Sequence, residues 1–250
     1  LIWLSVLKVC RQVLAQAVQL GIEVLGVSIS NQRETTVLWH KAKDKVLAPA
    51  IVWQDRRTAD YCQQLKDQGH EEWVQQKTGL LADPYFSASK LSWMLDNVPA
   101  ARSLAEQGQL CFGTVDCYLL WRLSAGQVHA TDASNASRTL LFNIQQQCWD
   151  AELLQLFNIP TTLLPNVLDS AAHFASTRPE LFGAPIPILG ILGDQQAALL
   201  GQACTEAGMS KSTYGTGCFA VVNTGATALN SQHKLLSTVA WRLNGQTTYA

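Results

Sequence analysis

The chain has 250 residues and a mass of 27.4 kDa, enough to bury a sizeable core in one large domain or two. Hydrophobic residues make up 48% and charged residues only 15%, below the roughly 25% of an average globular domain, which argues against a disordered chain. The net charge of -1 and the pI near 6.6 exclude nucleic acid as a main partner, because neutralising phosphates requires clustered Lys and Arg.

The cysteines and the N-terminal residues both favour a cytoplasmic protein. The seven cysteines include no C-x-x-C pair and none at zinc-ligand spacing from a histidine, so we expect reduced thiols. The apolar start of the chain is interrupted by Lys8 and Arg11, is too short for a membrane span and lacks a signal-peptide cleavage pattern. The sequence therefore predicts a cytoplasmic location and no membrane-spanning segment.

The beginning of the chain predicts a helix followed by three short strands. In residues 3–18 the apolar side chains recur at steps of three and four, which indicates an amphipathic helix, and Gly21 is placed to end it. Strands are predicted at residues 22–29, 35–39 and 50–53, because each is a short apolar or β-branched run bounded by polar residues.

The middle of the chain is mainly helical in pattern. Helices are predicted at residues 58–68, 71–78, 87–97 and 113–123, and a strand at residues 139–144. The polar stretch 129–139 precedes that strand, and residues 158–187 hold five of the eight prolines, which predicts a loop-rich connection.

The last part of the chain alternates strands with a helix. Residues 188–192 form an apolar run between glycines, typical of a buried strand, and residues 197–200 begin a packed helix. Strands are predicted at residues 212–216 and 219–223, and a hairpin at 239–250 around its Asn-Gly pair. Strands that alternate with helices predict an α/β architecture.

Polar residues follow four of the predicted strands, at the point where each strand ends. The four clusters are Arg33-Glu34, residues 53–55, residues 194–196 and residues 214–217. In α/β sheets ligands bind beyond the carboxyl ends of strands, so the four clusters together predict a ligand site. Each alone has a plainer explanation: a local ion pair, a tight glycine turn, or, for Asp194, an N-cap that satisfies free amides of its helix.

Six segments of the chain resemble, in the same order, the signatures of the glycerol kinases, members of the FGGY family of sugar and polyol kinases. The segments are residues 30–36, 51–58, 83–90, 131–139, 193–198 and 213–219. The Gly-Asp-Gln and Gly-Thr-Gly elements among them are shared more widely within the family. The first and third segments are typical of glycerol kinases.

The resemblance implies a role for individual residues. Substrate hydroxyls would be bound by Arg33, Glu34, Tyr85, Asp194 and Gln195, while Trp53 would pack on the carbon backbone of glycerol. Thr216 and Gly217 would contact the nucleotide phosphates, which fits the close approach that a glycine-flanked turn allows. The chemistry agrees, because two carboxylates, an amide and a guanidinium can pair all three hydroxyls of a triol and penalise an analogue that lacks one.

Asp194 is the candidate catalytic residue. Phosphoryl transfer to an alcohol needs a group that accepts the hydroxyl proton, and a carboxylate at a strand end can also help to hold Mg²⁺. Gln196 is expected to be structural. Asp132 and Arg138 are expected to form a buried ion pair that supports the site.

The resemblance also implies a fold, a domain arrangement and an activity. We expect a ribonuclease-H-like, actin-type α/β fold, with residues 1–203 forming most of the substrate-binding domain and residues 204–250 beginning the nucleotide-binding domain. The activity implied is ATP-dependent phosphorylation of glycerol to glycerol 3-phosphate, in an enzyme that is a homo-oligomer at full length. The phosphate-binding loop and the rest of the nucleotide domain have no counterpart in the chain, so we expect a fragment that alone turns over glycerol poorly or not at all.

Two other functions stay open at this point. A related kinase of another polyol or a pentulose would keep Asp194 and the Gly-Thr-Gly turn but should lack the combination of Arg33-Glu34 with Tyr85. A catalytically inactive ligand-binding or assembly module could use the same fold.

Overall fold

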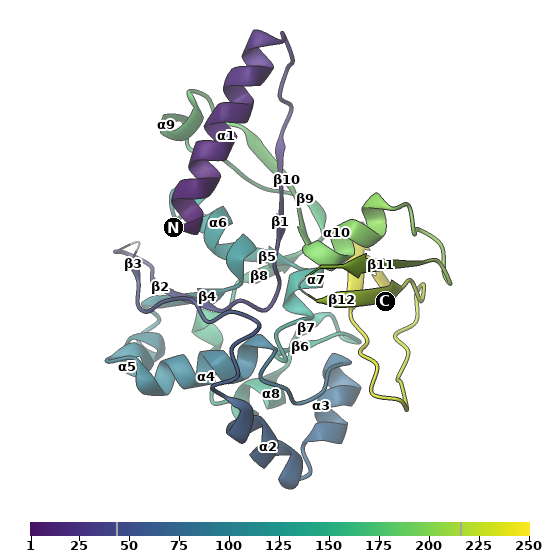
Figure 1. The fold of residues 1–250 in the computed structure, drawn as a ribbon. Coiled ribbons are helices and arrows are strands. Elements are labelled where there is room, and N and C mark those ends of the chain that lie inside the picture. The colour runs from purple at the N-terminus through teal and green to yellow at the C-terminus, as the bar shows by residue number, and fades with distance from the viewer. Residues whose placement is uncertain (44, 216) are drawn as a thin grey trace.

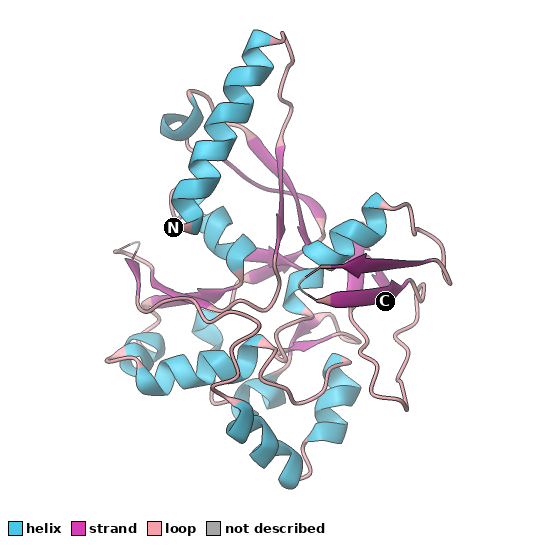
Figure 2. Cartoon of the chain, in the orientation of Figure 1, coloured by secondary structure: helices cyan, strands magenta, loops and turns pink. Residues whose placement is uncertain are grey.

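The computed structural model describes residues 1–43, 45–215 and 217–250, and it has the predicted mixed α/β fold. The longer strands and several helices occupy the upper part of the view, and a group of helices gathers in the lower part (Figures 1 and 2). The two parts meet at the loops that follow the strands, which is where the candidate site lies.

The N-terminal helix α1 spans Ile2–Gln19 and confirms the amphipathic pattern. Gly21 follows the C-cap residue Leu20 and has a φ of +66°, a conformation that glycine adopts without strain. Trp3 on the inner face of the helix joins an apolar cluster with Ile29 and Leu120, so burial of this face attaches the helix to the central sheet.

The central sheet positions the ends of two parallel strands side by side. Its strands are β1 (Val27–Asn31), β10 (Pro187–Gly193) and β9 (Ala171–Ser176) in the order β1-β10-β9. β1 and β10 are parallel, and Asn31 pairs with Gly193, so the residues after both strands emerge at the same edge. The strand predicted from residue 22 begins only at Val27, and β9 lies in the stretch that was predicted to be mainly loop.

A second, antiparallel sheet supports the segment between the site residues. It consists of β3 (Lys45–Val46), β2 (Val37–His40) and β4 (Leu110–Gly113) in the order β3-β2-β4. The strand predicted at residues 50–53 was wrong: only Ile51 pairs, with Thr36, and a turn follows in which the Asp55 amide donates to the Val52 carbonyl. This turn leaves Trp53 on a loop instead of in a ladder.

The helical part of the molecule surrounds a large apolar core. Its helices are α2 (Ala59–Asp67), α3 (Glu71–Thr78), α4 (Ser87–Asn97), α5 (Ala101–Glu106) and α8 (Ala151–Leu156). The predictions for α2, α3 and α4 are confirmed, whereas α5 was not predicted. These helices share one apolar core, whose members include Leu65, Val74, Leu91 and Phe157. Phe86, the residue just before α4, is buried in the same core, so close packing holds the start of α4 in place.

The polar stretch 129–139 is buried despite its composition. It contains β5 (Ala130–Asp132) and α7 (Ala133–Ala136), and the Asp132 carboxylate caps α7 by accepting from the Ser134 and Asn135 amides at 3.0 Å each. Helix α6 (Val115–Leu123) comes earlier in the chain and starts two residues later than the predicted helix 113–123, because Gly113 is the last residue of β4. Short elements complete the region: β6 (Phe142–Asn143), β7 (Cys148–Trp149), η1 (Thr161–Leu163), β8 (Asn166–Leu168) and α9 (Pro179–Phe182).

A buried polar network ties the end of β1 to its neighbours. The Asn31 Nδ2 amide donates to Asp116 Oδ1 at 3.1 Å and to Asn135 Oδ1 at 3.0 Å. Asp116 also accepts from the Thr131 hydroxyl, and burial raises the pKa of this carboxyl to about 6. The network fixes the chain two residues before Arg33.

The C-terminal part follows the predictions closely. Helix α10 spans Asp194–Gly201, β11 spans Ser210–Tyr214, β12 spans Cys218–Val222, and β13 (Val239–Leu243) and β14 (Gln246–Tyr249) form the predicted hairpin. Asn244 and Gly245 both have positive φ, as a two-residue hairpin turn requires. Among the described residues no helix is both long and apolar enough to cross a membrane.

We expect Asp132→Ala to destabilise the fold by roughly 3 kcal/mol, because it removes the cap of α7 and leaves buried donors unpaired, including the Ser170 hydroxyl that donates at 2.7 Å. Urea unfolding followed by circular dichroism measures this loss. Asp67→Ala removes an exposed carboxylate from α2 and should cost less than about 0.5 kcal/mol. Equal losses in the two variants would contradict the buried cap.

Candidate active site

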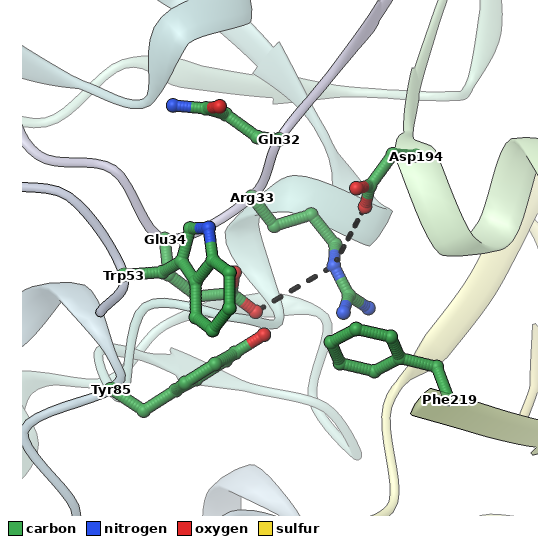
Figure 3. Close-up of a pocket in the computed structure, with 7 residues that line it drawn as sticks. All are labelled: Gln32, Arg33, Glu34, Trp53, Tyr85, Asp194 and Phe219. Atoms are coloured by element: carbon green, nitrogen blue, oxygen red, sulfur yellow. Dashed lines mark ion pairs between the residues drawn. The ribbon is translucent and has the colours of Figure 1, made fainter. Parts of the chain in front are cut away.

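A small cavity lies at the edge where β1 and β10 end. Its volume is about 50 Å³, which at roughly 10–15 Å³ for each water suits a ligand of a few heavy atoms. Its lining contains five of the six predicted substrate-binding residues (Figure 3): the full set is Gln32, Arg33, Glu34, Trp53, Tyr85, Asp194 and Phe219. Residues from five separate segments therefore converge on one small space.

Arg33 is the centre of the polar side of the cavity. It follows β1, and its Nε lies 3.2 Å from Asp194 Oδ1, at the start of α10 after β10. Its Nη1 donates to Gln196 Oε1 at 3.1 Å, and Gln196 in turn donates to the Val239 carbonyl. The expectation that Gln196 is structural is confirmed by these contacts. Arg33 Nε is buried and forms no hydrogen bond with the described part of the chain.

Gly193 provides the space through which the Arg33 side chain passes. A Cβ at this position would lie 2.8 Å from Arg33 Cδ and 2.9 Å from Gln196 Oε1, closer than such atoms approach in proteins. The glycine before Asp194 is therefore needed for the packing of Arg33 as well as for the chain direction between strand and helix.

Glu34 is held in an uncommon backbone conformation. Its φ is +62°, in the left-handed region that few non-glycine residues adopt, and its side chain is buried. Glu34 Oε1 accepts from Arg138 Nε at 2.7 Å and lies 3.6 Å from Arg33 Nε. The expected ion pair between Asp132 and Arg138 was therefore wrong: both side chains are buried, but Arg138 pairs with Glu34 while Asp132 caps α7.

Two aromatic rings form the apolar side of the cavity. Trp53 and Tyr85 lie with their ring centroids 5.6 Å apart, and the Tyr85 hydroxyl points toward Arg33 and Glu34 (Figure 3). Burial raises the pKa of Tyr85, and the Glu34 carboxylate adds to this rise, so the phenol stays protonated and can donate a hydrogen bond. The guanidinium carbon of Arg138 lies 5.8 Å from the Tyr85 ring centroid, a cation–π contact.

Asp194 is the most accessible carboxylate of the cavity, with 44% of its side chain exposed. Its Oδ1 contacts Arg33 and accepts from the backbone N–H of Gln195 at 2.8 Å. Its Oδ2 has no hydrogen-bond partner among the residues described. Asp194 is the first residue of α10, and the N-cap position is Gly193. Asp194 therefore lies beside a cleft, and a helix-capping role does not account for its free oxygen.

Gln195 does not line the cavity. It is buried, and its Oε1 accepts from the Lys211 ammonium, which also donates to Thr213 Oγ1 at 2.8 Å. Its Nε2 has no hydrogen-bond partner within the described segments.

The predicted nucleotide contacts lie on the turn between β11 and β12. Thr216 falls outside the described residues. Gly217 is described, and a Cβ there would lie 2.8 Å from the Phe219 ring, so its missing side chain allows that ring to reach the cavity wall. Glycine at position 217 is therefore needed for the packing of Phe219, apart from the contact with phosphate that the sequence predicts.

Sequence analysis missed two of the lining residues. Gln32 lies within the segment that predicted Arg33 and Glu34, and Phe219 lies within the segment that predicted Gly217, but neither side chain carried a signal of its own. The guanidinium of Arg33 lies 6.0 Å from the Phe219 ring centroid, a contact between residues that the sequence places far apart.

The side chains of the cavity could hold Mg²⁺ only if substrate phosphates supplied most of its ligands. Among residues 1–43, 45–215 and 217–250 no cluster of three or more His, Cys, Asp or Glu side chains could hold a metal. Of the two carboxylates in the lining, Asp194 is the exposed one and has an oxygen without a hydrogen-bond partner among the described residues. Mg²⁺ in kinases is commonly bound by one or two carboxylates together with substrate phosphates, and a single aspartate is compatible with that arrangement.

Comparisons with known proteins identify relatives along the whole chain. Residues 1–201 match the N-terminal domain of the FGGY family of carbohydrate kinases. The chain is 62% identical to a glycerol kinase of Alcanivorax borkumensis and 60% identical to glycerol kinase 1 of Pseudomonas aeruginosa, in each case over 100% of this chain and 50% of the relative. The chain thus spans about half the length of the curated relatives it matches.

Solved structures share the fold. The crystal structure of Plasmodium falciparum glycerol kinase with ADP matches with a TM-score of 0.89 and 32% identity, over 96% of this chain and 49% of that chain. A ligand-bound xylulose kinase of Lactobacillus acidophilus matches with a TM-score of 0.83 at 18% identity, over 99% of this chain and 49% of that chain, which supports the fold alone.

We expect the buried pair of Glu34 and Arg138 to be strongly coupled. Arg138→Met should cost about 3 kcal/mol of unfolding free energy because it leaves a buried carboxylate short of a partner, and the double variant with Glu34→Gln should lose clearly less than the sum of the single losses. A double-mutant cycle in urea measures this coupling. The exposed pair Arg102–Asp96 is the control and should give less than about 1 kcal/mol; additive losses at Glu34 and Arg138 would contradict the expectation.

Proposed function

Because the chain belongs to the FGGY family of carbohydrate kinases, we propose that it forms most of the substrate-binding part of an ATP-dependent glycerol kinase. In this proposal residues 1–203 belong to the substrate-binding domain and residues 204–250 begin the nucleotide-binding domain. The identity of about 60% to glycerol kinases supports glycerol as the substrate, and the family match to residues 1–201 supports the domain boundary.

The observation that carries the proposal is the set of unpaired polar atoms around one small cavity. Arg33 Nε is a buried donor without a hydrogen bond, and Glu34 Oε2 and Asp194 Oδ2 are acceptors without a partner among the described residues. A buried donor such as Arg33 Nε is normally paired, and the two carboxylate oxygens are acceptors open to the cavity, so the three atoms together favour a small ligand with several hydroxyls. The rings of Trp53 and Phe219 would cover its C–H groups.

In the proposed reaction a terminal hydroxyl of glycerol would attack the γ-phosphorus of ATP, ADP would leave, and Asp194 would accept the hydroxyl proton, which gives glycerol 3-phosphate. Arg33 holds the Asp194 carboxylate at 3.2 Å, and Glu34, Tyr85 and Arg33 orient the remaining hydroxyls. Gln195 lies outside the cavity lining, so its predicted contact with a hydroxyl has no place in this arrangement. ATP would supply the phosphoryl group and Mg²⁺ would neutralise its phosphates; Asp194 would hold the metal, and Thr216 and Gly217 would contact the phosphates.

The proposal extends to the cytoplasm and to homo-oligomeric assembly of the full-length enzyme. All seven cysteines are free, which suits a reducing compartment. Exposed apolar side chains on α1, among them Leu4, Val13 and Val18, offer surface for contact with further protein.

A substrate panel separates glycerol kinase from a kinase of another polyol or pentulose. With glycerol as the substrate, 1,2-propanediol should react roughly 100-fold less efficiently, because the missing hydroxyl leaves buried groups unpaired. A preference for a pentulose such as xylulose would overturn the substrate assignment, and the absence of turnover with every substrate would favour the inactive module.

Asp194→Asn in the full-length protein should lower kcat by about 10³-fold and leave the glycerol dissociation constant within about fivefold of the wild type. The reason is that the amide keeps the shape of the carboxylate but accepts a proton poorly. Steady-state kinetics and calorimetry measure the two effects. Glu206→Gln makes the same chemical change at an exposed position and should leave both values unchanged; normal turnover by Asp194→Asn would refute the general base.

A further inference from the structure

Lys90 is a buried cation to which neither the sequence nor the proposed reaction assigns a role. It lies on α4, in the same segment 83–90 that predicted Tyr85, and its side chain is fully buried. Within the described residues no carboxylate lies within 4.0 Å of its ammonium group. Burying a charge without a close counter-ion is costly, so its partners need an explanation.

Those partners are two backbone carbonyls of the candidate site. Lys90 Nζ donates to the Tyr85 carbonyl at 2.7 Å and to the Glu34 carbonyl at 3.4 Å. Both of these residues line the cavity, and they come from segments that are distant in the sequence. One ammonium group therefore connects the loop after β1 to the start of α4.

The carbonyl of Glu34 receives an unusual number of donors. Besides Lys90, it accepts from Ser87 Oγ at 3.1 Å and from Thr36 Oγ1 at 3.2 Å. A left-handed backbone at a non-glycine residue costs of order 1–3 kcal/mol and persists only where its surroundings hold it. The three donors are the surroundings that hold the Glu34 backbone, and this backbone directs the Glu34 carboxylate to the cavity.

We propose that Lys90 is a positioning residue for the substrate, which sets the separation of Glu34 and Tyr85 by binding both of their carbonyls. The inference rests on the proposed function, because it assigns these two side chains to the substrate hydroxyls. Lys90 itself touches no substrate atom. Its removal should weaken glycerol binding more than it affects the nucleotide or the chemical step.

Deprotonation of Lys90 should change protein stability and substrate affinity in opposite directions, which distinguishes a positioning role from a purely structural one. Burial lowers the pKa of Lys90 to about 8, and the carboxylates of Glu34, Asp55 and Asp83 and the thiol of Cys62 oppose this shift. As pH rises from about 8 toward 10.5 the folded protein loses this proton before the unfolded chain does, so the contribution of Lys90 to stability increases. Over the same range the neutral amine is a weaker donor, so substrate affinity should fall.

The test compares Lys90→Met with the wild type in the full-length protein. The KM for glycerol should rise about tenfold, with the KM for ATP within twofold. In the wild type the KM for glycerol should also rise above pH 8, whereas the KM of Lys90→Met should be independent of pH in this range. An unchanged KM for glycerol at Lys90→Met, or the same pH dependence in both proteins, would overturn the proposal.

Two further variants serve as controls. Ser89→Ala removes a buried hydrogen bond to Thr58 from the same helix without touching either carbonyl, and it should lose stability with an unchanged KM for glycerol. If Lys90→Met fails to fold, Ser87→Ala removes one donor from Glu34 alone and should raise the KM for glycerol a few-fold; no rise would overturn the proposal. If the proposed function is wrong, the wild type itself does not turn over glycerol. The KM values of the wild type and Lys90→Met are then compared with the substrate that the panel identifies.

Discussion

The candidate site depends on the burial of the Arg33 guanidinium between the ends of two adjacent parallel strands. The group contacts Asp194 after β10, approaches Glu34 beside it, and donates to Gln196 in the first turn of α10. A buried cation without such partners would be unstable, because its charge would be desolvated without compensation. Arg33 therefore links the acid after β10 to the acid after β1, and Arg138 holds the latter at 2.7 Å.

This arrangement places charge where a small polyol can use it. Two guanidinium groups, Arg33 and Arg138, face two carboxylates, Glu34 and Asp194, and each acid keeps one oxygen free of protein hydrogen bonds among the described residues. The fixed charges need little reorganisation when a substrate binds, which is how preorganised sites favour polar chemistry in a small volume. The rings of Trp53 and Tyr85 form the apolar side of the same cavity.

The positions of these groups rest on packing that is remote from the cavity. Asn31, Asp116 and Asn135 tie the end of β1 to α6 and α7, and the apolar core beneath α4 holds the segment that carries Tyr85 and Lys90. Glycine at position 193 and at position 217 provides room for Arg33 and Phe219. The cavity therefore depends on several elements that hold its lining side chains in place, and on two glycines that leave room for them.

The sequence by itself determined the local elements with strong periodicity or turn chemistry, such as α3, α4 and the hairpin around Asn244, and it identified Arg33, Glu34, Trp53, Tyr85 and Asp194 through their resemblance to family signatures. Tertiary structure alone decided the rest. The predicted strand at residues 50–53 became a loop because a single pairing at Ile51 is followed by a turn, and the polar residues around Asp132 became buried because their partners lie far away in the chain. The left-handed conformation of Glu34, the place of Phe219 and the role of Lys90 likewise depend on contacts between distant segments, and local sequence patterns carry no information about which distant groups will satisfy a buried polar atom.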